Sequence, residues 1–197
     1  MPATRPAQRQ DHRLAFLRGF LTRPKEVGSI IPSSRFMEKR IVNTARLREA
    51  KLAIELGPGT GGTTKAFLRA MAPDAKLLAI EINPDFVKLL NETIDDDRLI
   101  VHEGSAADIP SALGKYGLDT PEVILSGIPF STMDRELGLS ILQSVHDALP
   151  KHGRFVAYQF RDRVETLGNN VFGQANVQTE LLNVPPMRVY RWEKTED

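Results

Sequence analysis

The amino-acid sequence predicts an α/β fold: a mostly parallel β-sheet with helices on both faces and an antiparallel hairpin at its C-terminal end. Short apolar runs typical of buried parallel strands recur along the chain, with turns and segments of helical character between them. Residues 184–192 read as a closing hairpin. At 197 residues the chain has the length of one domain and can bury a full core.

The composition is that of an ordinary soluble globular protein, with 41% hydrophobic and 26% charged residues. The lack of cysteine excludes disulfides and thiolate metal sites and fits a reducing cytoplasm. The histidines are scattered without ligand spacing, so we expect no metal site. No apolar run approaches the length of a membrane span, and we do not expect an integral membrane protein.

We expect residues 1–33 to form an N-terminal arm with an amphipathic helix, and residues 34–197 to form the main domain. Residues 11–23 repeat apolar side chains at helical spacing, and Pro24 ends the pattern. A short basic helix with an apolar face is typical of an interfacial membrane anchor, but also of a helix packed over a domain edge. The apolar positions are Leu14, Phe16, Leu17, Phe20 and Leu21.

Charge is distributed unevenly along the chain. Residues 1–50 hold eleven Lys and Arg against four Asp and Glu, whereas the rest hold fifteen against twenty-one. The N-terminal surplus suggests a basic face for an anionic partner, either a membrane or a nucleic acid, and the alternative is a solvated helical face.

The first predicted strand, residues 52–56, runs directly into a glycine-rich turn. Gly57, Gly59 and Gly61 stand at alternate positions, and residues 63–71 have helical character. A strand, a glycine turn and a helix in this order predict a nucleotide-cofactor site, because glycine lets backbone amides approach a ligand closely.

Glu55, two positions before the first glycine, decides between cofactors. A carboxylate there repels a pyrophosphate and suits a ligand that carries an ammonium and a sulfonium, as S-adenosylmethionine (SAM) does. The pattern E-x-G-x-G-x-G after a strand resembles motif I of the class I SAM-dependent methyltransferases. Two alternatives remain: a dinucleotide site, since Gly57, Gly59 and Gly62 also fit G-x-G-x-x-G, and a tight turn without a ligand.

The second predicted strand, residues 77–81, ends in Glu81, which lies 26 residues after Glu55. In an alternating α/β fold this is where an acid binds both ribose hydroxyls. Asn83 and Pro84 then start a helix over residues 85–92.

The third predicted strand, residues 99–102, leads into a turn over residues 103–108. The resemblance to class I SAM-dependent methyltransferases implies that this turn holds the adenine of SAM. Many of those enzymes have Asp where this chain has Ser105. Ser105 or Asp108 is therefore the expected adenine contact, and the sequence leaves the choice open.

A fourth strand over residues 123–125 ends at the turn 126–130, and ligands bind at this edge of open α/β sheets. A helix over residues 133–149 and a fifth strand over residues 154–160 follow. Upstream of the first strand, Ser33 or Ser34 can cap a helix that runs to about residue 47.

Taken together, five segments resemble the bacterial phospholipid N-methyltransferase family, whose members are related to the ribosomal RNA adenine dimethyltransferases. The resemblance implies a Rossmann-like class I methyltransferase fold with a seven-stranded sheet. It also implies methylation of phosphatidylethanolamine, up to phosphatidylcholine, at the cytoplasmic side of the inner membrane, with residues 11–23 on anionic lipid and no nucleic-acid partner. The segments are residues 27–34, 55–61, 81–84, 126–130 and 185–190.

The resemblance and the motifs together define the candidate site. The expected SAM-binding residues are Ser33, Ser34, Glu55, Gly57, Gly59, Thr60, Gly61, Glu81, Ile82, Ser105, Ala106 and Asp108. The expected catalytic residues are Ser126, Gly127, Ile128, Pro129, Phe130 and Tyr158. Arg188 and Arg161 are candidates for the lipid phosphate.

The expected chemistry is mostly positioning of an amine against the sulfonium methyl. The backbone carbonyls of Ser126 and Gly127 can accept from the amine, and the rings of Phe130 and Tyr158 can stabilise the product ammonium, unless both rings simply pack in the core. One departure concerns the head group: the family often has Gln-Phe-Thr-Tyr near the fifth strand, where this chain continues from Phe160 with Arg161.

Three rival functions remain open on sequence grounds. An RNA adenine N6-methyltransferase has Asn or Asp, two prolines and an aromatic residue at the fourth strand, whereas this chain has Ser126-Gly127-Ile128, and we expect no room for an RNA-binding helical domain after the hairpin. A small-molecule methyltransferase and a SAM-binding protein without enzymatic activity are the others.

Overall fold

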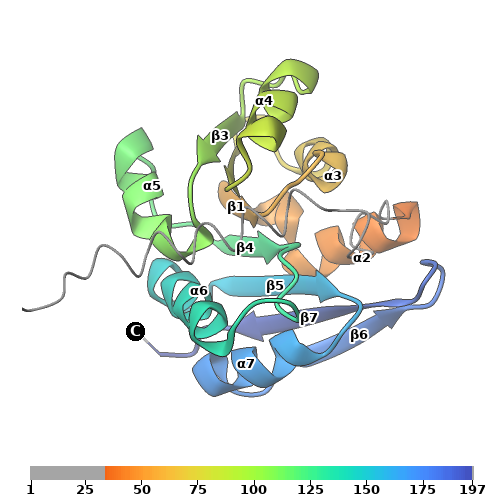
Figure 1. Ribbon diagram of the computed structural model, residues 1–197. Helices are drawn as coiled ribbons and strands as arrows, with labels where there is room; N and C mark the ends of the chain where they lie inside the picture. Colours follow the sequence, from red (N-terminus) through yellow and green to blue (C-terminus); the bar gives the residue numbers. More distant parts are fainter. Residues whose placement is uncertain (1–33, 197) are drawn as a thin grey trace, which may run out of the picture.

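The computed structural model describes residues 34–196, which form one seven-stranded sheet in the order β3-β2-β1-β4-β5-β7-β6 (Figure 1). β7 runs antiparallel to both of its neighbours, and the other pairs are parallel. The predicted mostly parallel seven-stranded sheet with a C-terminal antiparallel hairpin is therefore confirmed. The strands are β1 (Leu52–Leu56), β2 (Lys76–Glu81), β3 (Leu99–Glu103), β4 (Val123–Ser126), β5 (Arg154–Gln159), β6 (Asn176–Glu180) and β7 (Met187–Glu193).

Helices cover both faces of the sheet. Helices α5, α6 and α7 pack on one face, α2 and α3 pack on the other, and α4 lies against β2 and β3. The α-helices are α2 (Arg35–Ala45), α3 (Gly62–Ala70), α4 (Pro84–Thr93), α5 (Ile109–Tyr116), α6 (Arg135–Ala148) and α7 (Arg163–Phe172), and the short 3-10 helices are η2 (Leu47–Glu49) and η3 (Ala106–Asp108).

The central strands are apolar on both sides because both sides meet helices. On β1, Ala53 belongs to the core beneath α2 and α3, whereas Ile54 and Leu56 belong to the core beneath α5, α6 and α7. All five residues of β1 are buried, the pattern of a parallel strand between two helix layers.

Local chemistry moves several boundaries by one or two residues from those predicted. The helix expected to reach residue 47 ends at Ala45, because Arg46 adopts a left-handed conformation with φ of 49° and closes the helix. α6 begins at Arg135 rather than residue 133, because the Asp134 carboxylate caps it by accepting from the Leu137 amide at 2.7 Å.

The closing hairpin spans more chain than residues 184–192. β7 alone covers most of that stretch, and its partner β6 is the largely polar segment Asn176–Glu180. Within the described residues, no helix is both long and apolar enough to cross a bilayer.

Candidate active site

The carboxyl ends of the parallel strands lie at one edge of the sheet. The last residue of β1, Leu56, is in register with Ile80 of β2 on one side and with Ser126 of β4 on the other. The turns that follow these strands therefore lie at this edge, as expected for an open α/β sheet (Figure 1).

The glycine turn between β1 and α3 has the backbone that its glycines allow. Gly57 and Gly61 have φ of 69° and 81°, and a Cβ at Gly57 would lie 2.9 Å from the Ile128 side chain. Gly59 also has a positive φ, but a Cβ there would meet nothing within 4 Å. The turn is thus packed against protein at Gly57 and open at Gly59, where a ligand can approach.

Glu55 is fully buried beneath this turn. Its two carboxylate oxygens accept hydrogen bonds from the hydroxyls of Thr63 and Thr64, at 2.5 and 2.6 Å. Burial raises the pKa of Glu55 to about 7, even though both hydroxyl contacts lower it. The carboxylate therefore joins the end of β1 to the first turn of α3.

Thr63 and Thr64 are site residues that the sequence analysis missed. The sequence indicates only that they belong to a helix, whereas their hydroxyls hydrogen-bond the buried acid. The available signal was two adjacent hydroxyl residues in the first turn of the helix that follows an acid-glycine motif.

Glu81, at the end of β2, is also buried and reaches the glycine turn. One of its oxygens accepts from the Gly59 amide at 3.1 Å and the other from the Asn83 amide at 2.9 Å. Desolvation raises the pKa of Glu81, and these backbone contacts oppose the rise. Glu81 thus lies beside the open position of the turn, next to the exposed Thr60 and the half-buried Ile82.

The turn after β3 contains both candidate adenine contacts in different settings. Ser105 is buried, and its hydroxyl accepts from the Ala107 amide at 3.1 Å. Ala106 is buried as well, whereas Asp108 is exposed. The contact with adenine stays a prediction for both Ser105 and Asp108.

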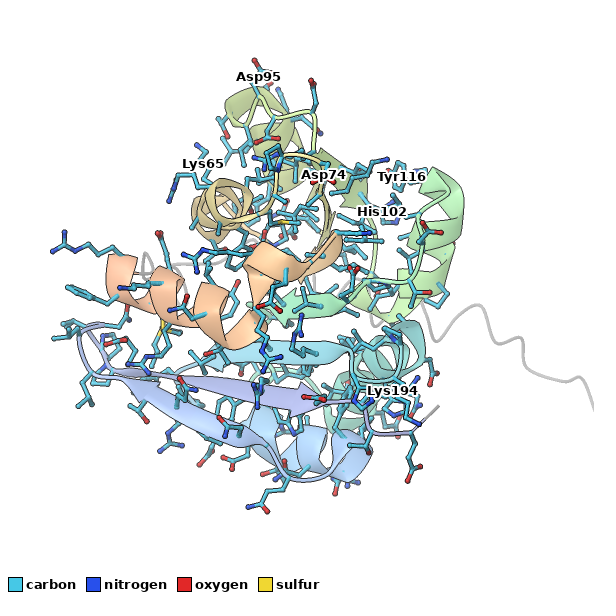
Figure 2. All side chains as sticks on the ribbon, turned by 180° about the vertical axis from the view of Figure 1, so that it is seen from behind. Lys65, Asp74, Asp95, His102, Tyr116 and Lys194 are labelled. Carbon is cyan, nitrogen blue, oxygen red and sulfur yellow. The ribbon has the colours of Figure 1, made fainter. Side chains whose placement is uncertain are left out.

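The His102 ring packs against Gly104 in this turn. A Cβ at Gly104 would lie 2.5 Å from the Nε2 atom of His102, so only glycine fits against the ring. On its other side His102 meets Tyr116 of α5 edge-on, with ring centroids 5.7 Å apart (Figure 2). Within residues 34–196, no cluster of His, Asp and Glu has the makeup of a metal site.

The turn 126–130 after β4 is held by its own backbone and by Gln159. The buried Ser126 hydroxyl accepts from the Ile128 amide at 3.3 Å. The Ile128 carbonyl accepts from the Gln159 side-chain amide and from the Phe130 amide. The half-buried Pro129 carbonyl accepts from Thr132. Gln159 is a further residue that the sequence analysis did not assign to the site.

Tyr158 connects the 126–130 turn to the buried acid. Its hydroxyl lies 3.4 Å from that of Thr63, and a Cβ at Gly127 would lie 3.0 Å from the same hydroxyl. Burial, with the nearby Glu55 carboxylate, raises the pKa of Tyr158, so the phenol stays protonated. The structure therefore brings Glu55, Thr63, Gly127 and Tyr158 together.

Phe130 lies in the core rather than at the surface of the turn. Its side chain is fully buried in the core beneath α6 and α7, together with Met133, Leu137 and Leu167. Because its ring faces are covered by apolar neighbours, the structure gives no support for a contact with a product ammonium. Core packing, the alternative left open by the sequence, is the role that the structure shows.

The remaining candidates lie around this edge. Arg161 and Arg188 are exposed where β5 ends and β7 begins, and Arg188 lies 3.8 Å from Asp162. Ser34 caps α2 and donates its amide to Asn183 at 3.0 Å, so α2 and the β6–β7 turn hold it in place. Ser33 and the predicted helix 11–23 lie outside the described residues.

The residues at the glycine turn fit SAM. Gly59 leaves an open approach to the backbone, Glu81 offers a carboxylate beside it for hydroxyl donors, and Glu55 places an ionisable acid beneath. This donor set suits a ligand with ribose hydroxyls and positive charge.

Comparison with known proteins points to methyltransferases. A family model described as ribosomal RNA adenine dimethylase matches residues 23–108, the part that holds the first three strands. An ornithine lipid N-methyltransferase of Singulisphaera acidiphila is 27% identical over 177 residues, which is 89% of this chain and 92% of the relative. A ribosomal RNA small subunit methyltransferase A of Caulobacter vibrioides is 32% identical over 95 residues, and the match spans only 34% of that relative.

Solved structures share the fold at low sequence identity. The N-methyltransferase NodS of Bradyrhizobium japonicum, solved in complex with S-adenosyl-L-homocysteine, has a TM-score of 0.67 and 12% identity over 92% of this chain and all of its own. A 1,6-didemethyltoxoflavin N1-methyltransferase of Burkholderia thailandensis has a TM-score of 0.67 and 15% identity over 100% of this chain and 93% of its own. The strand order and the acid-glycine turn give the chain the class I methyltransferase fold, and these comparisons support a SAM-dependent N-methyltransferase that is similar to the ribosomal RNA adenine dimethylases over residues 23–108.

Proposed function

We propose that the protein methylates the amino head group of a membrane lipid, with phosphatidylethanolamine and its mono- and dimethyl forms as substrates and phosphatidylcholine as the final product. The observation that carries this proposal is the similarity to an ornithine lipid N-methyltransferase over 92% of that relative, whereas the ribosomal RNA methyltransferases match over much shorter parts of their length.

The geometry of the 126–130 turn supports an aliphatic amine rather than a planar base. Ser126 turns its hydroxyl into its own turn, and Phe130 is in the core. Neither side chain is placed to hold and stack on an adenine. The turn instead offers backbone groups, and we propose that the carbonyls of Ser126 and Gly127 accept hydrogen bonds from the amine.

When bound, SAM supplies an electrophilic methyl group on a sulfonium. Glu81 and the glycine turn would hold it, and the Glu55 carboxylate would offset its positive charge. The substrate amine must be neutral to react, although a primary ammonium has an ordinary pKa of about 10.4, as in Lys. Removal from water and the nearby positive charge lower that pKa, while the protonated Tyr158 hydroxyl can hydrogen-bond the amine but is a poor base.

We also propose that the enzyme works at the cytoplasmic face of the inner membrane as a peripheral protein. The basic, apolar pattern of residues 11–23 supports this location, and it predicts contact with anionic lipids. Arg161 and Arg188 are the proposed partners of the lipid phosphate.

The test is methyl transfer from labelled SAM to vesicles that contain phosphatidylethanolamine, with the products separated by chromatography. We expect mono-, di- and trimethylated head groups. Vesicles with ornithine lipid and a ribosomal RNA fragment are assayed in parallel, because the similar relatives are named for these substrates. If only ornithine lipid is labelled, the substrate is a lipid with a different head group from the one proposed. If only RNA is labelled, the lipid assignment is refuted.

A further inference from the structure

Exposed large apolar side chains gather at one end of the described part of the chain. Five of them are Phe36, Phe160, Leu181, Leu182 and Val184, and we call these five the apolar tip. Val184 is 84% exposed and Leu181 72%. Concentration of such side chains at one place is typical of an interaction surface, since single exposed apolar residues are usually scattered.

Hydrogen bonds fix the β6–β7 turn with its apolar side chains outward. The buried Asn183 accepts from the Ser34 amide at 3.0 Å and donates to the Pro185 carbonyl at 2.9 Å. The Leu182 amide donates to the Glu180 carboxylate at 3.0 Å. The turn thus buries its amide side chain and exposes its leucines and valine, the reverse of the usual preference.

Helix α2 packs beside this turn and extends the tip. Arg40 of α2 donates to Glu180 at 2.7 Å and to Gln178 at 3.2 Å. Phe36 and Leu182 line the same cleft of about 450 Å³ between α2 and the hairpin. In the antiparallel pair of β5 and β7, Gln159 lies opposite Arg188. Phe160, the next residue along the chain, therefore lies near the start of β7.

The apolar tip lies at the same edge of the sheet as the active site. β6 runs parallel to β4 and β5, because β7 is antiparallel to both β5 and β6. The turn after β6 therefore leaves the edge at which Ser126 and Gln159 end their strands. Figure 1 shows this turn, the arrowheads of β4 and β5 and one end of α2 on one side of the molecule.

Cationic side chains surround the tip. Arg35, Lys39, Arg161 and Arg188 are exposed, and the Arg35 guanidinium lies 5.0 Å from the centre of the Phe36 ring. Two nearby acids are paired with arginines: Glu180 with Arg40, and Asp162 with Arg188. An apolar centre with a basic rim is complementary to a bilayer that carries anionic head groups.

We propose that the apolar tip inserts into the surface of an anionic bilayer and holds the active-site edge over the lipid head groups. The inference rests on the proposed lipid substrate, but it concerns the β6–β7 turn and the start of α2 rather than residues 11–23. Insertion brings the amine within reach of the 126–130 turn without removing the lipid from the membrane.

A tryptophan reporter in the full-length chain tests insertion directly. The chain has a single tryptophan, Trp192, which is 2% exposed and gives a constant background. In Leu182→Trp we expect the emission to shift to shorter wavelength on vesicles of phosphatidylcholine and phosphatidylglycerol. These vesicles hold no methyl acceptor, so the readout does not depend on activity. Val177→Trp, at an exposed β6 position outside the tip, is the matched control and should not shift.

Affinity gives the second readout. Combined Leu181→Ser, Leu182→Ser and Val184→Ser should weaken vesicle binding by about tenfold or more, because the apolar area transferred to lipid is lost. Val177→Ser should leave it unchanged, and SAM affinity should stay the same in both variants.

An unshifted Leu182→Trp spectrum on vesicles would overturn the proposal. A shift that grows with protein concentration in the absence of lipid would also overturn it, since the tip would then bind a second copy of the chain. If the shift occurs but no lipid is methylated, the membrane-binding role of the apolar tip is upheld and the proposed lipid substrate is refuted.

Discussion

At the residue scale, the two buried acids of the site have different partners and different tasks. Glu55 is bonded to the hydroxyls of Thr63 and Thr64, whereas Glu81 is bonded to the amides of Gly59 and Asn83. The carboxylate of Glu81 can therefore exchange backbone contacts for the hydroxyls of a bound ribose, whereas we propose that Glu55 acts through its charge.

Replacing Glu81→Ala should weaken SAM binding by more than about tenfold, because the hydroxyl contacts are lost and two amides lose their acceptor. Calorimetric titration measures the change. Asp74→Ala, an exposed acid before the opposite end of β2, is the control and should bind normally. Unchanged affinity in Glu81→Ala would remove the ribose assignment.

The raised pKa of Glu55 predicts that SAM binding depends on pH. Below its pKa of about 7 the acid is mostly neutral, and above it the carboxylate attracts the positive ligand. Affinity should therefore rise from about pH 6 to about pH 7.5, with protons released on binding. Titration in buffers of different ionisation enthalpy counts those protons.

Glu55→Gln provides the matched control, because it keeps an oxygen for the threonine hydroxyls and removes the titration. Its SAM affinity should be weaker and its pH dependence smaller. Tighter binding by the wild type at pH 6 than at pH 7.5 would contradict this role of Glu55.

At the element scale, glycines mark where helices approach the sheet closely. In α7, a Cβ at Gly168 would contact the Trp192 ring, with 2.8 Å to Cε2, and Trp192 stacks in turn on Phe155 and Tyr190. In α5, a Cβ at Gly114 would meet nothing within 4 Å.

Gly168→Ala should lower the free energy of unfolding by about 1–3 kcal/mol, because α7 must move away from the rigid ring stack. Gly114→Ala should raise it by about 0.4–1 kcal/mol, since alanine favours the helix and restricts the unfolded chain. Urea denaturation of both variants measures the difference. Equal effects would show that α7 does not pack closely on β7.

The elements that sequence could predict are those whose signal is local. Strands β1, β2 and β4 are short apolar runs because both of their faces are covered, and Asn83 with Pro84 marks the start of α4. The polar strand β6 lacks such a signal. The contact of Gln159 with Ile128 and that of Asn183 with Ser34 join residues 31 and 149 positions apart, so no local pattern could predict them.

At the scale of the whole molecule, positive charge is concentrated in the first quarter of the sequence. If residues 11–23 bind the membrane as proposed, the combined Arg13→Glu and Arg18→Glu should lower affinity for phosphatidylglycerol vesicles by about tenfold or more, at roughly 1 kcal/mol per basic residue. Co-sedimentation at constant salt measures it.

The matched control is Lys51→Glu with Lys76→Glu. It makes the same change in net charge, but at the exposed start of β2 and the residue before β1, away from the active-site edge. Equal loss in both double variants would mean that total charge, not the N-terminal helix, determines vesicle binding.

The proposed function depends most on the cofactor site formed by Glu55, the glycine turn and Glu81. The most direct measurement is a crystal structure with S-adenosyl-L-homocysteine. We predict the ribose hydroxyls on the Glu81 carboxylate, the amino-acid part along Gly57–Gly61, and the adenine at the Ser105–Asp108 turn. A ligand bound elsewhere, or a glycine turn closed against it, would contradict the account.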